Sequence, residues 1–82
     1  MEKRRIQFGS IRDIEEFVRI TAKLRGSVSV SRGEQVMDGK AILGLLSLGL
    51  HRPLTLSYEG ERAEFDRFTR SIAHYFVPAV PK

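Results

Sequence analysis

Few side chains in this 82-residue chain could carry chemistry, and Ser10 is the first of them. It stands three residues before Asp13 in the stretch GSIRDIEEFV. A serine followed at this spacing by an acid is typical of a helix N-terminus, where the hydroxyl accepts a hydrogen bond from a first-turn amide. The alternative is a serine that carries a phosphoryl group, but a hydroxyl is a weak nucleophile without an added base. We favour the capping role.

The chain has two histidines, His51 and His74, and no cysteine. An imidazole offers a neutral nitrogen nucleophile near physiological pH, but we expect neither histidine near Ser10. His51 is expected at a turn or helix end, and His74 on the solvent side of the last helix. The lack of cysteine excludes disulfides and thiolate metal sites. The sequence has no metal-ligand cluster, glycine-rich phosphate loop or triad, so we expect no metal, no cofactor and no conventional enzyme.

Hydrophobic periodicity predicts the elements that position these side chains. Strands are predicted over residues 3–8 and 27–31, in RGEQVM after a glycine turn, and in RPLTLSYEG. Helices are predicted around residues 14–24, over 40–50, and over 61–77, where Phe65, Phe68, Ile72 and Phe76 form an apolar stripe. Residues 1–77 are then one domain, and Pro78 and Pro81 leave residues 78–82 as a short tail.

The order β-α-β-β-α-β-α implies an α+β open-faced sandwich, in which three helices cover one face of a four-stranded antiparallel sheet.

The stretch KAILGLLSLGL is unusually apolar for a short helix that rests on a sheet. Leu45, Leu48 and Ala41 are expected to share the face towards the sheet. Ile42, Leu43 and Leu46 then point elsewhere, because residues one or two apart on a helix do not share a face. Either the first helix covers this second set or a partner does. We favour a docking surface, since exposed apolar clusters tend to mark interaction sites.

The segment GKAILGLLSLGL followed by LTLSYEG resembles the second-helix and last-strand signature of HPr, the histidine-containing phosphocarrier protein of the bacterial sugar phosphotransferase system. The resemblance covers nearly the whole chain. It implies an acceptor histidine in a His-x-Arg-Pro motif before the first helix. Ser10 stands at the position of that histidine, Arg12 matches the arginine, and Asp13 replaces the proline. In many members a regulatory serine at the start of the second helix is also phosphorylated, and Ala41 stands there instead.

Both phosphorylation positions of the family are therefore lost, so the resemblance implies a non-phosphorylatable binding or regulatory module related to sugar transport. Its partner-binding residues would be Arg12, Ile42, Leu43 and Leu46, on the face with which HPr proteins dock enzyme I, enzyme II components and transcription regulators. The first alternative is a phosphocarrier with Ser10 as an atypical acceptor. Asp13 argues against it, since a carboxylate in the first turn satisfies the free amides and repels a phosphate dianion.

The net charge of +4 permits an acidic partner, so the second alternative is a polyanion-binding domain. The basic residues are scattered and no aromatic stacking platform accompanies them, so nucleic acid is not the favoured partner. No apolar run approaches the roughly 20 residues that span a bilayer. We therefore expect no membrane insertion and a place in the bacterial cytoplasm, where the lack of cysteine is also usual.

Overall fold

The elements follow one another along the chain in the predicted order, and the computed structural model describes residues 2–77. They are β1 (Glu2–Ile6), α1 (Ile11–Thr21), β2 (Ser27–Arg32), β3 (Gln35–Asp38), α2 (Ile42–Leu48), β4 (Leu54–Glu59), α3 (Arg62–Ser71) and the 3-10 turn η1 (Ala73–Tyr75). The predicted tail, residues 78–82, lies outside the described residues.

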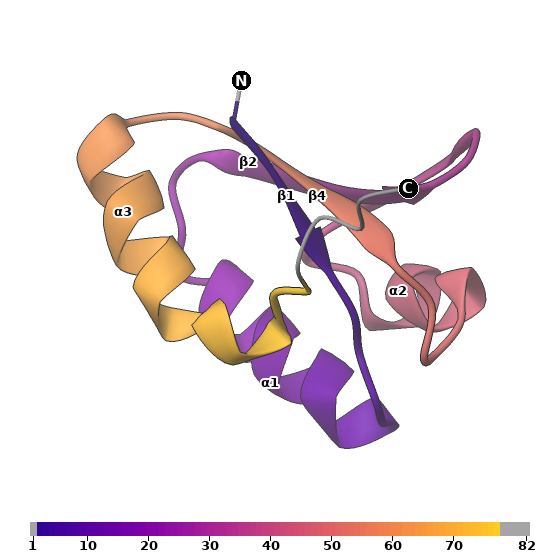
Figure 1. Cartoon of the computed structure of the whole chain (residues 1–82). Helices are drawn as coiled ribbons and strands as arrows, with labels where there is room; N and C mark the ends of the chain where they lie inside the picture. The colour runs from indigo at the N-terminus through magenta and orange to yellow at the C-terminus, as the bar shows by residue number, and fades with distance from the viewer. Residues whose placement is uncertain (1, 78–82) are drawn as a thin grey trace.

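The four strands form one sheet in the order β1-β4-β2-β3, and all neighbouring strands are antiparallel. The alternating pattern of β2 and β4 buries one set of side chains and leaves serines and a threonine on the other face. Figure 1 shows the three helices on the buried side of the sheet. The predicted open-faced sandwich is therefore confirmed.

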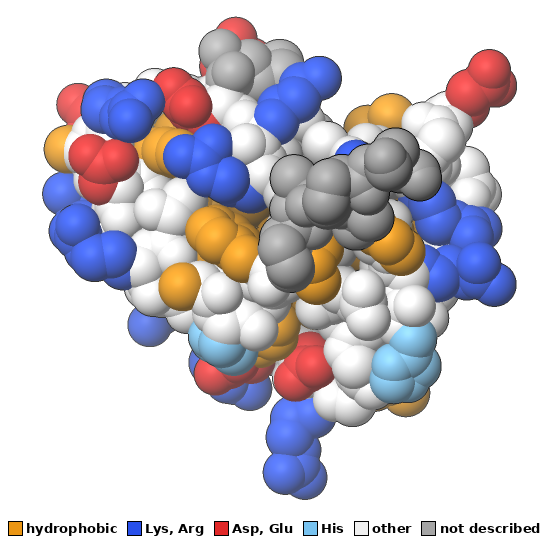
Figure 2. Space-filling view, viewed as in Figure 1, with side chains coloured by type: hydrophobic (Ala, Val, Ile, Leu, Met, Phe, Trp, Pro, Cys, Tyr) orange, Lys and Arg blue, Asp and Glu red, His pale blue; other side chains and the backbone are white. Residues whose placement is uncertain are grey.

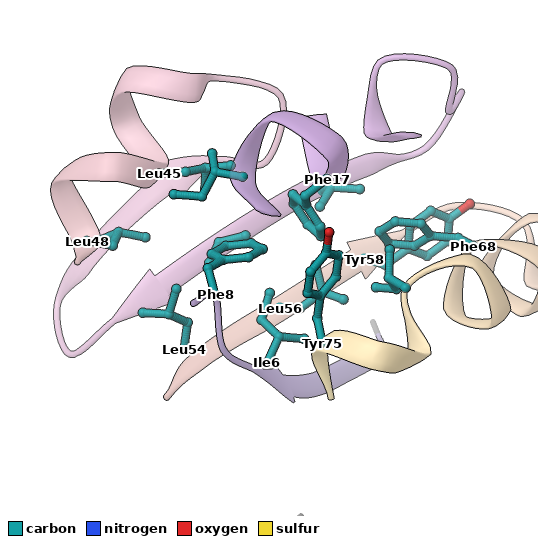
Figure 3. Close-up of a cluster of buried hydrophobic side chains, with 14 of the residues drawn as sticks. Ile6, Phe8, Phe17, Leu45, Leu48, Leu54, Leu56, Tyr58, Phe68 and Tyr75 are labelled. Carbon is teal, nitrogen blue, oxygen red and sulfur yellow. The ribbon is translucent and has the colours of Figure 1, made fainter. Parts of the chain in front are cut away.

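Aromatic rings fill the space between the sheet and the helices, as Figure 3 shows. The ring of Phe8 lies 5.1 Å from that of Phe17 and 5.5 Å from that of Tyr75, centroid to centroid, both in edge-to-face arrangements. Such pairs contribute beyond the area that they bury. The remaining buried apolar residues are Ile6, Ile14, Val28, Val30, Leu45, Leu48, Leu54, Leu56, Tyr58, Phe65, Phe68 and Ile72.

The last helix is shorter than predicted. It ends at Ser71, because the backbone leaves the helical region at Ile72 (φ −116°, ψ 15°). The turn η1 then brings Tyr75, not Phe76, into the core, with only 3% of Tyr75 exposed. Phe76 is half-buried and forms a β-bridge with Ile6. The prediction of a continuous helix over 61–77 is thus wrong, because backbone pairing with β1 replaces its last turns.

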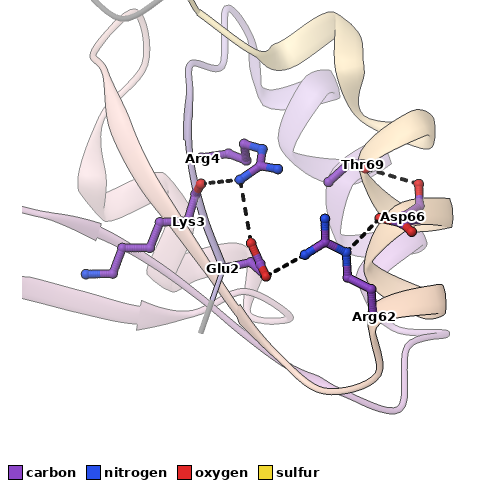
Figure 4. A network of polar contacts seen from close by, with 6 residues as sticks. All are labelled: Glu2, Lys3, Arg4, Arg62, Asp66 and Thr69. Atoms are coloured by element: carbon purple, nitrogen blue, oxygen red, sulfur yellow. Dashed lines mark hydrogen bonds and ion pairs between the residues drawn. The ribbon is translucent and has the colours of Figure 1, made fainter.

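Exposed polar contacts connect α3 to the edge strand β1, as Figure 4 shows. The guanidinium of Arg62 lies 2.7 Å from a carboxylate oxygen of Glu2 and 3.3 Å from one of Asp66. Arg4 lies 4.0 Å from the other oxygen of Glu2. Exposed ion pairs contribute little stability each, so we expect these contacts to add little to the free energy of unfolding.

A single carboxylate fixes the loop between α1 and β2. Glu64 of α3 accepts hydrogen bonds from the amides of Arg25 (2.8 Å) and Gly26 (2.9 Å) and from the hydroxyl of Tyr58 (2.6 Å). These donors lower the pKa of Glu64 to about 2, since they favour its charged form. Burial and the same carboxylate raise the pKa of Tyr58 to about 12. Glu64 therefore stays ionised near neutral pH and holds this loop in place.

Candidate protein-docking surface

Helix α2 is short, and it rests on the core through two leucines. Leu45 and Leu48 are completely buried, as the helical spacing predicts. Ala41 was expected on the same face, but it is exposed. It is the N-cap residue, with an extended backbone (φ −111°, ψ 107°), so it precedes the helical turn and does not follow the helical periodicity. The prediction for Ala41 is therefore wrong.

The other apolar residues of α2 divide into two groups. Leu43 is 81% exposed and Ile42 is 39% exposed, both in the first turn. Leu46, one turn later, is half-buried and packs against the core cluster. We call Ile42, Leu43 and Leu46 the α2 apolar patch. Internal packing thus covers part of Leu46, but no described neighbour encloses Leu43.

A further exposed apolar side chain, that of Ile11, begins α1 and is 52% exposed. The hydrophobic pattern did not predict this exposure, because Ile11 lies three residues before the buried Ile14 and so at helical spacing from it. Helices α1 and α2 pack against each other. Arg12, the next residue of α1, is exposed, and its side chain forms no hydrogen bond or ion pair within residues 2–77. The structure therefore places Arg12 and the patch on adjoining helices without a direct bond between them.

The loop before α1 satisfies its own polar groups. Ser10 is the N-cap residue, and its hydroxyl accepts a hydrogen bond from the amide of Asp13 at 3.2 Å. The carboxylate of Asp13 in turn accepts one from the amide of Gly9 at 2.8 Å. The predicted capping role of Ser10 is confirmed, with the difference that Asp13 reaches back one residue further than in a standard capping box. The chain's own side chains thus occupy amides that would otherwise attract an anion.

His51 lies beside this loop, so the expectation that both histidines are remote from Ser10 is wrong. Its amide donates a 2.7 Å hydrogen bond to the carbonyl of Phe8. Its ring atom Cε1 is 3.8 Å from the point where a Cβ of Gly9 would stand, and Oδ2 of Asp13 is 3.4 Å from the same point. The backbone of His51 is left-handed (φ 62°), which costs a non-glycine residue about 1 kcal/mol. The loop after α2 therefore brings an imidazole to the start of α1.

His74 is exposed, as predicted, and belongs to a different cluster. Its Nε2 lies 3.1 Å from a carboxylate oxygen of Glu16, which also accepts a hydrogen bond from the hydroxyl of Tyr75. These two contacts lower the pKa of Glu16, and burial raises that of Tyr75. Both effects follow from the packing of η1 against α1, so we assign this cluster a structural role.

The described part of the chain offers little other chemistry. Residues 2–77 contain no group of three or more side chains that could hold a metal ion. None of the helices in that range is long and apolar enough to cross a membrane. Figure 2 shows Lys and Arg side chains at several separate places on one face of the molecule, with acidic residues between some of them. This distribution is unlike the continuous basic stripe of nucleic-acid-binding proteins.

The chain is similar in structure to several phosphocarrier proteins. The phosphocarrier protein HPr of Bacillus anthracis str. Ames matches with 20% identity and a TM-score of 0.70, over 93% of this chain and 96% of that one. HPr-C-His from Thermoanaerobacter tengcongensis matches with 22% identity and a TM-score of 0.74, over 90% and 89%. A mycoplasma histidine-containing phosphocarrier protein matches with 14% identity and a TM-score of 0.70, over 89% of each chain.

No protein-family model and no curated protein sequence matches the chain. The similarity therefore lies in the arrangement of the helices and strands described above. This chain has the fold of the HPr phosphocarrier proteins.

Proposed function

We propose that this chain is an HPr-like protein-binding module of the bacterial cytoplasm, related to the sugar phosphotransferase system. It docks partner proteins through the α2 apolar patch and carries no phosphoryl group at Ser10 or Ala41. The observation that carries this proposal is the exposure of Leu43 (81%) and Ile42 (39%) in the first turn of α2.

Covering the patch is favourable, because full burial of an exposed leucine contributes roughly 1.5–3 kcal/mol. The charges around it define the partner. Lys40 and Arg12 are exposed near the starts of the two adjoining helices, and the first turn of α2 contains no acidic residue. We therefore propose a partner with an apolar pocket and carboxylates at its rim. The fold similarity to phosphocarrier proteins supports components of the phosphotransferase system as that partner.

The loop before α1 supports the loss of phosphoryl transfer at the family position. Ser10 caps the helix and Asp13 occupies the amide of Gly9. A phosphate placed there would compete with both contacts and meet the carboxylate of Asp13. Ala41 has no hydroxyl to modify. The module would then recognise partners without carrying the phosphoryl group between them.

The test is a titration of ¹⁵N-labelled protein with purified enzyme I and, separately, with enzyme II components of the source organism, followed by amide NMR. We expect the largest shift changes at Ile42, Leu43 and Leu46 and in the first turn of α1. Changes confined to the open face of the sheet would contradict the proposed surface. Absence of binding to every phosphotransferase protein tested would contradict the proposed partner class.

A second candidate function, a phosphocarrier with an atypical acceptor, gains support from one observation. His51 is exposed, and its ring makes no hydrogen bond within residues 2–77, while its Cε1 lies against Gly9. A neutral imidazole nitrogen is a better nucleophile for phosphoryl transfer than the hydroxyl of Ser10. His51 is therefore a stronger candidate acceptor than Ser10.

Mass spectrometry after incubation with enzyme I and phosphoenolpyruvate separates these possibilities. A gain of one phosphate that is acid-labile and disappears in His51→Ala would assign His51 as the acceptor. An acid-stable gain that disappears in Ser10→Ala would assign Ser10. No gain in the wild-type chain, together with binding to enzyme I, is the result that the binding-module proposal predicts.

A further inference from the structure

A furrow of about 320 Å³ runs between α1 and α3, on the side of the molecule where these two helices lie next to each other in Figure 1. It is separate from the α2 apolar patch, because none of its lining residues belongs to α2. Three apolar residues, two basic residues and one acidic residue account for most of its lining: Ile20, Leu24, Phe68, Lys23, Arg67 and Glu64.

The apolar residues form a floor that is already in place. Phe68 is only 2% exposed, and Ile20 and Leu24 are half-buried and pack against the core. Ile20 comes from α1 and Leu24 from the turn that follows it, and Phe68 is the apolar residue that α3 contributes to the lining. A ligand would therefore meet a preformed apolar surface and would not have to open the core.

Two basic side chains, those of Lys23 and Arg67, also line the furrow. Lys23 and Arg67 are exposed, and neither forms an ion pair or a side-chain hydrogen bond within residues 2–77. Lys23 lies just after α1 and Arg67 lies on α3, so the two cations line the furrow from two different segments. Such a pair attracts an anion from both sides.

The hydrogen-bond acceptors at the furrow already have donors within the chain. Both carboxylate oxygens of Glu64 accept the hydrogen bonds described above. At the end of α1, the carbonyl of Ile20 accepts from the amide of Lys23, and that of Thr21 from the amide of Leu24. The carbonyl of Leu24 accepts from the ammonium of Lys40 at 3.1 Å. Glu64 keeps its negative charge, because all its donors are neutral, so the two cations Lys23 and Arg67 outnumber one carboxylate and the lining carries a net charge of +1.

We propose that this furrow binds a small amphipathic anion, with one carboxylate on an aromatic or short aliphatic body. The body would lie on the floor of Ile20, Leu24 and Phe68, and the carboxylate between Lys23 and Arg67. The volume is at the lower end of the range for small-molecule sites, which fits a compact ligand. This proposal is independent of the docking function proposed above.

The experiment is an amide NMR titration with 3-phenylpropionate, and with 3-phenylpropanol as the uncharged analogue of the same shape. The variant Lys23→Glu with Arg67→Glu removes the two cations. The control Lys3→Glu with Arg5→Glu makes the same change in net charge on the outer face of β1. Thermal unfolding of both variants checks the fold. If the first variant is destabilised, Lys23→Ala with Arg67→Ala replaces it.

We expect saturable shift changes at Ile20, Leu24 and Phe68 with the carboxylate, and binding at least about tenfold weaker in the furrow variant. The control variant should bind as the wild type does, and the alcohol should bind more weakly than the carboxylate. Equal binding of alcohol and carboxylate would overturn the charge assignment. Shift changes outside the furrow, or equal losses in both double variants, would overturn the site.

Discussion

Helices α1 and α2 pack against each other, but polar side chains fix the ends of only the first. The N-terminus of α1 has the cap from Ser10 and the carboxylate of Asp13, and Glu64 holds the loop that follows the helix. Helix α2 starts at Ala41 with no side-chain cap and has no acidic residue in its first turn. Its first turn instead exposes two large apolar side chains.

The two helices differ in what they leave free: α1 has its polar groups partly satisfied within the chain, whereas α2 exposes apolar side chains. At α1 the amides of Gly9 and Asp13 already have acceptors within the chain, and the carboxylate of Asp13 disfavours an external anion at this helix start. At α2 the buried leucines hold the helix, while Leu43 and part of Ile42 stay uncovered by the rest of residues 2–77. The part of the molecule best suited to an intermolecular contact is therefore α2 and not the loop before α1.

The largest expected effect comes from the buried face of α2. Because α2 has no side-chain cap and rests on Leu45 and Leu48, Leu45→Ala should lower the free energy of unfolding by about 3 kcal/mol, the usual cost of a cavity at a fully buried leucine. Leu43→Ala, on the exposed face, should change it by less than about 0.5 kcal/mol. Urea denaturation of the two variants measures both values. Equal losses would mean that Leu43 is as well packed as Leu45.

The carboxylate clamp after α1 should give the next effect. Glu64→Gln removes the charge from three hydrogen bonds and should cost about 1.5 kcal/mol, at the lower end for charged acceptors because Glu64 is partly exposed. The measurement is urea denaturation at neutral pH.

The same variant has a distinct pH dependence. Folding lowers the pKa of Glu64 from 4.5 to about 2, so its contribution is complete above pH 4.5 and is lost as the pH falls towards 2. The difference in stability between wild type and Glu64→Gln should therefore shrink over this window. A difference that stays constant from pH 7 to the acid end would contradict the role of the carboxylate charge.

The cap of α1 should have a smaller effect. Ser10→Ala should lower the free energy of unfolding by about 1 kcal/mol, because the amide of Asp13 loses its acceptor. Ser47→Ala is the matched control, since Ser47 is exposed within α2 and its hydroxyl only bonds the carbonyl of Gly44. That control should change stability by less than about 0.5 kcal/mol. A similar loss in both would show that Ser10 is not a significant cap.

The smallest effect should be a gain. Ala41→Ser supplies the hydroxyl that α2 lacks, at a residue whose extended backbone already suits an N-cap. We expect an increase of about 0.5 kcal/mol in the free energy of unfolding, measured by urea denaturation beside the wild type. No increase would show that the start of α2 is satisfied in some other way.

Local pattern was enough to predict much of the fold. The pattern predicted strands in SVSVS and RPLTLSYEG, and the alternate residues Val28, Val30, Leu54 and Leu56 of these strands are buried. The spacing of Ser10 and Asp13 predicted the cap because its hydrogen bonds join residues only a few positions apart. The two sets of apolar residues on α2 also followed from helical geometry, except at Ala41 and partly at Leu46.

The contacts that were missed join distant parts of the chain. His51 reaches Gly9 only because the loop after α2 crosses the start of α1. Tyr75 enters the core because residues after α3 pair with β1 and so interrupt the helical periodicity. The clamp formed by Glu64 joins α3 to a loop nearly forty positions earlier. Periodicity within one segment contains no information on such pairings.

The measurement that tests the central claim most directly is the affinity of Leu43→Asp for enzyme I, by calorimetry, beside that of Val36→Asp. Val36 is also apolar and 63% exposed, but it lies on β3. We expect Leu43→Asp to bind at least about 30-fold more weakly than the wild type, as a central interface leucine would, and Val36→Asp to bind unchanged. Wild-type affinity in a folded Leu43→Asp variant would contradict the account.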